Sequence, residues 1–184
     1  AEQALRQSEE RFRQVVTRLG EGVGFLDTGE CFRIANPAAE AIFGVTETGL
    51  VGRNLKEFLA PEETRRVLEE SEKRRRNEES CYELEIVRPG GDRRQILVTA
   101  VPGAARDGQI EGTLSVFRDI TERKRMEEEL RAKERLLSES QSIAHVGSWS
   151  WDVATGASVL QWSPETYRLH GVSPETFVPS GETL

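Results

Sequence analysis

The sequence has 184 residues, a formal net charge of -7 and 36% hydrophobic residues. This supplies enough apolar material for one domain of ordinary size, together with helices and part of a second domain. No run approaches the roughly 18 apolar residues of a membrane span, and no charged start followed by an apolar stretch marks a signal peptide. We therefore expect a cytoplasmic protein without membrane contact in this part of its chain. The acidic balance also argues against a nucleic-acid partner.

The sequence offers few groups for redox, metal or catalytic chemistry. Cys31 and Cys81 lie in separate strand patterns without a C-x-x-C motif, and His145 and His170 stand apart from any cluster of metal ligands. We therefore expect neither a disulfide framework nor a metal site, and we expect a reducing compartment. A glycine-rich phosphate loop, a nucleophile elbow and paired catalytic carboxylates are also missing, so no active site is predicted in these residues.

An amphipathic helix is predicted over residues 1–20. Its apolar side chains recur at near-heptad spacing, and Gly20 ends the pattern. Such a stripe has to be covered, either by the back of the following sheet or by the same helix of another protomer, and both can hold at once. We therefore predict a dimerisation helix whose contacts are made by Leu5, Phe12, Val15, Val16 and Leu19.

A hairpin and a short helix follow. Apolar residues alternate on both sides of the turn signal at 27–30, which predicts two antiparallel strands within 22–36. Asn36-Pro37 predicts the start of a helix, because asparagine can cap the first amides and proline suits the first helical position. Gly44 predicts its end.

Two more helical segments are predicted before the next strands. Residues 54–59 form a short helical turn, and Pro61 opens a longer charged helix that ends near Asn77. The run Arg74-Arg75-Arg76 is flanked by glutamates, so we interpret it as a solvated helix end.

A pair of strands comes next. Tyr82, Leu84 and Ile86 alternate with other residues, and a turn at 89–92 leads to a strand at 95–101. Because 95–101 is apolar on both sides, we expect a central strand that is covered on both faces.

The last strand passes into a helix without a turn signal. Leu114 and Val116 lie on the side predicted to be buried, and Phe117 interrupts the other, polar side. The apolar spacing then changes to four and seven, which predicts a coiled-coil-like linker helix over 122–140. Lys133 occupies one seam position, so the seam is expected to be adjustable; a solvated helix lying on its own domain is the alternative. The seam consists of Met126, Leu130 and Leu137.

The triplet at this junction, Asp119-Ile120-Thr121, resembles the signature that closes PAS domains of bacterial sensor proteins. The order of elements over residues 8–125 resembles that family too. The resemblance implies an α+β fold with a five-stranded antiparallel sheet, short helices on one face and a small central cavity, flanked by an N-terminal amphipathic helix and a C-terminal linker helix. At the exit, the carboxylate and the hydroxyl can cap the first helical amides while Ile120 packs beneath.

An internal repeat extends the resemblance. The pattern of residues 34–46 recurs at 160–173, so residues 141–184 are predicted to be the front part of a second PAS domain. The predicted division is a leading helix at 1–20, a PAS domain at 21–121, a linker helix at 122–140 and the partial repeat at 141–184.

Comparison with other members of the family argues against two classes of cofactor. Flavin-binding light sensors carry a reactive cysteine in a run that corresponds to residues 51–58, and haem-binding gas sensors carry a histidine on the long helix; this chain has neither. These differences argue against covalent flavin and histidine-ligated haem, and the cofactor stays unknown. The interior can be an apolar pocket for a small molecule or a packed core that binds nothing. The predicted pocket residues are Phe25, Ile34, Asn36, Ile42, Phe58, Val67, Tyr82, Leu84, Ile86, Leu97, Thr99 and Val116.

The resemblance implies a sensory module of a multi-PAS signalling protein, most of all a sensor histidine kinase of a two-component phosphorelay, working as a homodimer with an output domain in the same chain. A signal would pass through Asp119, Ile120 and Thr121 into the linker helix. A ligand-free dimerisation or interaction scaffold is one alternative, and the sensory front of a diguanylate cyclase or phosphodiesterase is another.

Overall fold

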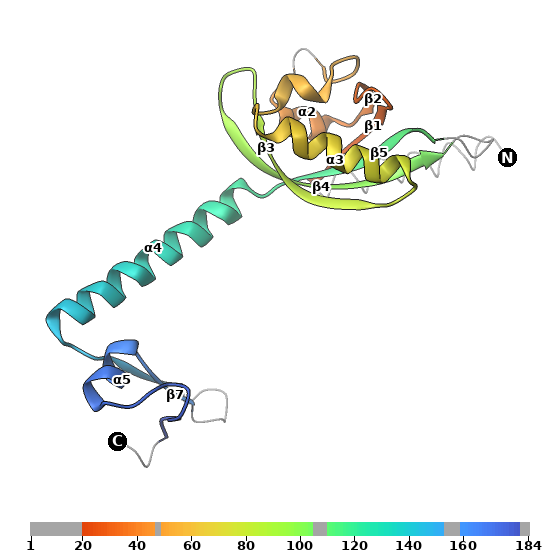
Figure 1. Cartoon of the computed structure of the whole chain (residues 1–184). Helices are drawn as coiled ribbons and strands as arrows, with labels where there is room; N and C mark the ends of the chain where they lie inside the picture. Colours follow the sequence, from red (N-terminus) through yellow and green to blue (C-terminus); the bar gives the residue numbers. More distant parts are fainter. Residues whose placement is uncertain (1–19, 47–48, 105–109, 153–158, 181–184) are drawn as a thin grey trace. The chain divides into compact units, whose positions relative to one another are not determined.

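The computed structural model describes residues 20–46, 49–104, 110–152 and 159–180 (Figure 1). The chain divides into two compact units, Ala1–Lys124 and Arg125–Leu184. Among the described helices, none combines the length and the apolar composition that crossing a bilayer requires. The predicted dimerisation residues lie outside the described residues: Leu5, Phe12, Val15, Val16 and Leu19.

The first unit is built on a five-stranded antiparallel sheet with the strand order β2-β1-β5-β4-β3. Helices α2 and α3 lie on one side of this sheet in Figure 1, so the predicted α+β architecture is confirmed. The strands are β1 (Gly22–Asp27), β2 (Phe32–Ala35), β3 (Ser80–Val87), β4 (Arg93–Ala104) and β5 (Ile110–Asp119). The helices are α2 (Pro37–Phe43), the 3-10 helix η1 (Leu55–Phe58) and α3 (Glu63–Arg75).

The hairpin and α2 are joined by one side chain. Asn36 Oδ1 accepts hydrogen bonds from the amide of Ala39 in α2, at 2.8 Å, and from the amide of Val23 in β1, at 2.9 Å. The helix ends at Gly44, whose φ of 73° is the left-handed conformation that glycine adopts without steric cost. Both predicted ends of this helix are confirmed.

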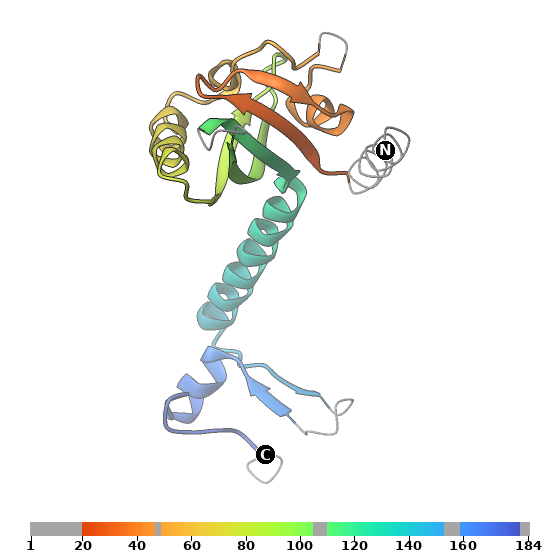
Figure 2. The same ribbon diagram turned by 90° about the vertical axis from the view of Figure 1, so that its right-hand side faces the viewer.

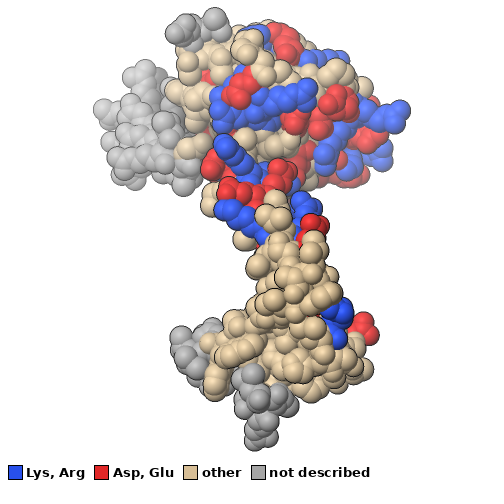
Figure 3. All heavy atoms as spheres, turned by 90° about the vertical axis from the view of Figure 1, so that its left-hand side faces the viewer, with Lys and Arg blue, Asp and Glu red and all other residues tan. Residues whose placement is uncertain are grey.

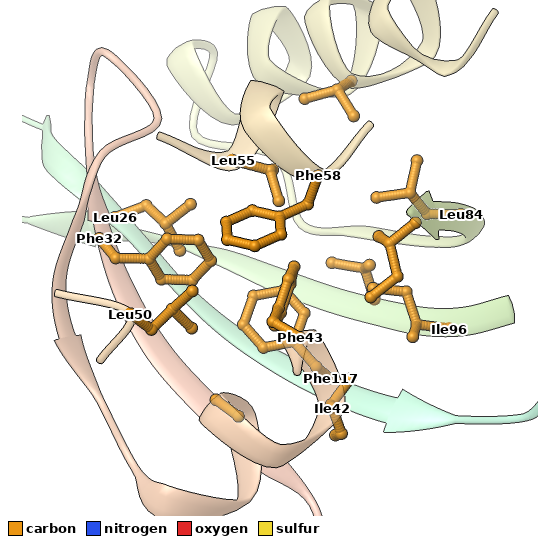
Figure 4. Packing of buried hydrophobic residues seen from close by; sticks show 14 of the residues in the cluster. Leu26, Phe32, Ile42, Phe43, Leu50, Leu55, Phe58, Leu84, Ile96 and Phe117 are labelled. Carbon is orange, nitrogen blue, oxygen red and sulfur yellow. The ribbon is translucent and has the colours of Figure 1, made fainter. Parts of the chain in front are cut away.

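Four phenylalanine rings fill the space between the helices and the sheet (Figure 4). The Phe43 ring lies 5.4 Å from that of Phe32, 5.1 Å from that of Phe58 and 5.2 Å from that of Phe117, each in edge-to-face geometry. Aliphatic side chains from η1, α3, β3 and β4 complete the cluster. The centre of this unit is therefore occupied by its own side chains.

The polar side of β5 faces the interior, contrary to the prediction. Thr113, Ser115 and Phe117 are buried, whereas Leu114 is 40% exposed. The hydroxyl of Thr113 is satisfied there by a hydrogen bond from Arg74 of α3, and Phe117 joins the aromatic cluster.

Helix α4 (Thr121–Ala144) follows β5 directly, as Figure 2 shows. It extends four residues beyond the predicted end at 140. The second unit then forms a hairpin of β6 (Trp149–Asp152) and β7 (Val159–Trp162), followed by the short helix α5 (Pro164–His170).

The second unit repeats the local contacts of the first. Ser163 Oγ accepts hydrogen bonds from the amides of Thr166, at 3.3 Å, and Ser148, at 3.0 Å, just as Asn36 does from Ala39 and Val23. Glycine precedes the strand amide in both units, at positions 22 and 147. A Cβ added there would lie 2.8 Å and 2.9 Å from the Cα of the third helical residue, Ala39 and Thr166. The same hairpin-to-helix clip therefore occurs twice.

Candidate functional site

The exit from β5 is bonded to the neighbouring strand β4. Asp119 Oδ1 accepts a hydrogen bond from the amide of Thr121 at 2.8 Å, which is the cap predicted from the sequence. Thr121 Oγ1 instead accepts a hydrogen bond from the Gln95 amide at 2.9 Å, and the amide of Ile120 donates to the Gln95 carbonyl at 2.9 Å. Ile120 is buried. The three residues thus connect the end of β5 and the start of the following helix to β4.

Charged groups hold the first turn of α4 against β3. Lys124 Nζ lies 2.6 Å from Glu83 Oε2, and Arg123 Nη2 lies 3.6 Å from Glu83 Oε1. The hydrogen bond from Lys124 lowers the pKa of Glu83. Figure 3 shows acidic and basic side chains crowded together where α4 leaves the first unit. Helix α4 is therefore connected to β3 and β4 as well as to β5.

The apolar seam of α4 is exposed. Met126, Leu130 and Leu137 have 60%, 58% and 59% of their surface accessible, and α4 has no buried residue. Lys133, at the polar seam position, pairs with Glu129 at 2.7 Å, one turn earlier. The helix presents this seam without a covering partner among the described residues.

Half of the predicted pocket residues lie in the core, where they pack against each other and the phenylalanine rings. Burial also raises the pKa of the Tyr82 hydroxyl. Their role in binding a ligand stays a prediction. These residues are Ile42, Phe58, Val67, Tyr82, Leu84 and Ile86.

The inward orientation predicted for five other residues is wrong. Ile34 is 65% exposed, and Thr99 is exposed beside its register partner Val116. Leu97, Thr99 and Val116 line a shallow depression of about 290 Å³ on the face of the sheet away from the core. The half-buried Phe25 lies on this outer face too, and its ring occupies the space beside Gly103 and Gly112.

The alternation in β1 gave the wrong inward face because glycine occupies two of the inward positions of this strand. Gly22 and Gly24 point toward Ala39 and Phe32, so the larger Val23 and Phe25 face outward. Asn36 is the sixth misplaced candidate: its amide forms the hairpin-to-helix clip instead of a polar anchor in a pocket.

A buried ion pair is the main feature that the sequence analysis missed. Arg74 Nη2 lies 3.0 Å from Glu30 Oε1, and the two side chains are only 4% and 10% exposed. Arg74 was predicted to lie at a solvated helix end, and this is wrong. The helical spacing could have identified it, since Val67, Ser71 and Arg74 fall at positions i, i+4 and i+7 of one buried stripe.

Hydroxyl groups from three elements complete this network. Arg74 Nε donates to Thr113 Oγ1 of β5 at 3.1 Å, Nη1 to Ser80 Oγ of β3 at 3.2 Å and Nη2 to Ser71 Oγ of α3 at 2.8 Å. The Ser71 hydroxyl also hydrogen-bonds Glu30 Oε1. The hairpin turn is thereby connected to α3, β3 and β5 through one guanidinium.

Comparisons with known proteins agree with this architecture. Residues 16–125 match the family model described as the PAS fold. The chain is 26% identical over 151 residues to the methanogenesis regulatory histidine kinase FilI of Methanothrix harundinacea (strain 6Ac). That match covers 82% of this chain and 17% of the kinase, so the chain spans only a small part of its curated relative.

Solved PAS structures share the fold. A sensory box histidine kinase/response regulator from Burkholderia thailandensis E264 is similar with a TM-score of 0.57 and 21% identity, over 70% of this chain and 98% of that one. A PAS domain from Colwellia psychrerythraea is similar with a TM-score of 0.55 and 21% identity, over 65% and 98%. Since the family model also matches more than half of the sequence, the chain belongs to the PAS fold family.

Proposed function

We propose that this chain is a sensory and regulatory module of a signal-transduction protein, most of all a sensor histidine kinase. It passes a change in the first unit through residues 119–121 into α4. The observation that carries this proposal is the exit itself, where Thr121 bonds to β4, Lys124 pairs with β3 and the helix beyond presents an uncovered apolar seam. The histidine kinase relative supports the kinase parent, whose catalytic site we place outside these residues.

The proposed mechanism is a change in how β4 and β5 hold the first turn. Gln95 contacts both Ile120 and Thr121, so a small shift of β4 changes the direction or rotation of α4. A helix whose seam residues are exposed can occupy two arrangements that differ by only a few kcal/mol. A signal that changes their relative free energy by a few kcal/mol is therefore sufficient to shift the populations of the two arrangements.

We propose that the protein forms a homodimer through α4. The seam of Met126, Leu130 and Leu137 has the spacing of a coiled coil, and Lys133 makes it weak enough to change register. The predicted helix at residues 1–20 would add a second contact between protomers.

We also propose that the second unit is the front part of another PAS domain, through which the signal continues. Support comes from the repeated clip, in which Ser163 takes the place of Asn36 and Gly147 that of Gly22. The output domain would follow in the same parent chain.

A relay without a ligand in the apolar core is a second candidate. The observation that favours it is the aromatic cluster, because four phenylalanine rings occupy the centre of the first unit. In this form, the module would receive its input from a partner, or from a ligand that binds away from the apolar core.

The test is Asp119→Ala in the full-length parent. Loss of the cap costs about 0.5–2 kcal/mol, so the domain stays folded, while output no longer follows the input. Output is measured as autophosphorylation of the parent and folding by circular dichroism. Glu128→Ala removes a carboxylate farther along α4 and should leave the response intact. A response to the input that survives Asp119→Ala unchanged would contradict the proposal.

A further inference from the structure

The buried network around Arg74 has the composition of an anion site. Its cation is almost fully buried, and three hydroxyl groups surround it. The only carboxylate hydrogen-bonded to it in the described part of the chain is Glu30, which reaches it from the hairpin turn. We propose that Arg74, Ser71, Ser80 and Thr113 form a binding site for a short-chain carboxylate, and that Glu30 closes this site when no ligand is bound.

The guanidinium is held in place without help from Glu30. Thr113 and Ser80 accept its Nε and Nη1 protons from β5 and β3, which leaves Nη2 directed at the carboxylate. A carboxylate oxygen at the Glu30 position receives a hydrogen bond from Arg74 Nη2, and it shares the single proton of the Ser71 hydroxyl with the Val67 carbonyl, which lies 2.7 Å from Ser71 Oγ. Such charge-assisted bonds are strong in a buried site. The donors are therefore preorganised for an incoming carboxylate.

The size of the site limits the ligand. A cavity of about 20 Å³ borders the ion pair, between the hairpin turn, α3 and β5. This volume holds about one water-sized group beyond the space that the Glu30 side chain fills. That side chain is equivalent to propionate attached to the backbone. A carboxylate of two to four carbons fits the combined space.

Other charges near the cavity are compatible with an anion. Arg75 lines the cavity from α3, and its charge is paired with that of Glu72 on the same helix. Asp27 lines it too, but its carboxylate accepts hydrogen bonds from the amides of Gly29 and Cys31, at 2.9 and 3.0 Å, and pairs with Arg33 at 2.7 Å. Its charge is thus already compensated within the turn.

The backbone of Glu30 is strained. Glu30 has a φ of 64°, in the left-handed region where a residue with a side chain is strained. Backbone bonds hold it there: the Glu30 amide donates to the Asp27 carbonyl at 3.0 Å, and the Leu55 amide donates to the Glu30 carbonyl at 2.9 Å. An external carboxylate that replaces the Glu30 side chain at Arg74 removes the buried ion pair that adds to these bonds and so loosens the turn. Because Thr113 belongs to β5, the strand that ends at Asp119, the ligand state reaches the exit; this last step rests on the proposed function.

The experiment follows amide hydrogen exchange, peptide by peptide, in the full chain. Glu30→Gly removes a propionate-sized group and relieves the strained backbone, but it leaves Arg74 buried without its carboxylate. We expect exchange in α3 and β5 to rise about tenfold or more. Propionate should restore protection and saturate, whereas propionamide and sodium chloride at the same concentrations should not. If Glu30→Gly is unfolded in the absence of propionate, recovery of α3 protection when propionate is added supports the inference equally.

Two comparisons complete the test. In the double variant Glu30→Gly/Arg74→Met, propionate should have no effect. In the natural sequence, propionate at ten times the concentration that saturates Glu30→Gly should increase exchange in the turn at 27–31, because it displaces Glu30. Peptides of the second unit should not respond in any sample.

Equal protection by propionamide, protection of the double variant, or an unresponsive turn in the natural sequence would overturn the inference. These readouts lie within the first unit and do not depend on the output of α4. A failure of the carboxylate site and a failure of the exit mechanism are therefore distinguishable.

Discussion

At the scale of single residues, Phe43 holds the interior of the first unit together. Its ring contacts those of Phe32, Phe58 and Phe117, which come from β2, η1 and β5. The next residue, Gly44, ends α2. One side chain thus connects the helical layer with the sheet.

Phe43→Ala should lower the free energy of unfolding of the first unit by about 3–5 kcal/mol, because it removes a fully buried ring and leaves a cavity. The measurement is urea unfolding followed by circular dichroism. Leu68→Ala is the matched control: Leu68 is 48% exposed on α3, so its loss should change the free energy of unfolding by at most about 0.5 kcal/mol. Similar losses for the two variants would contradict the assignment of the core.

The sequence predicted which residues are buried only in strands where apolar residues alternate with polar ones, so that one face of the strand is polar. Tyr82, Leu84 and Ile86 were placed correctly because they alternate with exposed or half-buried residues in β3. Leu97 was misplaced because β4 is apolar on both faces, so hydrophobicity cannot tell them apart. Thr113 was missed for the opposite reason: it is polar, and only its hydrogen bond with Arg74 in the folded chain makes its burial favourable.

At the scale of elements, the first turn of α4 is an electrostatic contact as well as a continuation of β5. Lys124 and Arg123 approach Glu83 from the helix, and Arg66 adds positive potential at the same carboxylate. The strand-to-helix order and the Asp119 cap were predictable from the triplet. The contact with β3 was not, since it joins residues from distant parts of the sequence.

Lowering the pH should break the ion pair between Glu83 and Lys124. The pKa of Glu83 is lowered in the folded state, so the pair with Lys124 is fully present above the ordinary glutamate pKa of about 4.3 and is lost as pH falls through the lowered value. NMR shifts of the Glu83 carboxyl group and of the amides at 121–124 should record this step. Glu83→Gln should abolish it. A Glu83 titration at or above the ordinary value would contradict the contact.

At the scale of the whole molecule, the two units contain the same hairpin-to-helix clip. All three tryptophans, Trp149, Trp151 and Trp162, belong to the second unit. Trp162 stacks on His170 with ring centroids 4.7 Å apart, so its fluorescence reports the packing of that unit. The second copy of the clip was predictable from its turn and cap residues. The division at residue 124, inside a continuous helix, was not, because helical periodicity runs across it.

The matched glycines allow the units to be destabilised one at a time. Gly22→Ala and Gly147→Ala each place a methyl group against the backbone of the following short helix, so each should cost about 1–3 kcal/mol. We expect Gly147→Ala to lower the Tm recorded by tryptophan fluorescence, and Gly22→Ala to lower only the other transition, seen by circular dichroism. A fluorescence transition that moves equally in both variants would show that the units unfold together.

The Asn36 clip also has a consequence for synthesis on the ribosome. The bond from Val23 to Asn36 closes over 13 positions, so the hairpin and α2 can assemble soon after they emerge. The other edge of β1 pairs with β5, which is translated much later. Until β5 emerges, this edge of the nascent chain is an unpaired strand open to other polypeptides. The interval between translation of β1 and β5 is thus the period in which this edge is open to incorrect strand pairing.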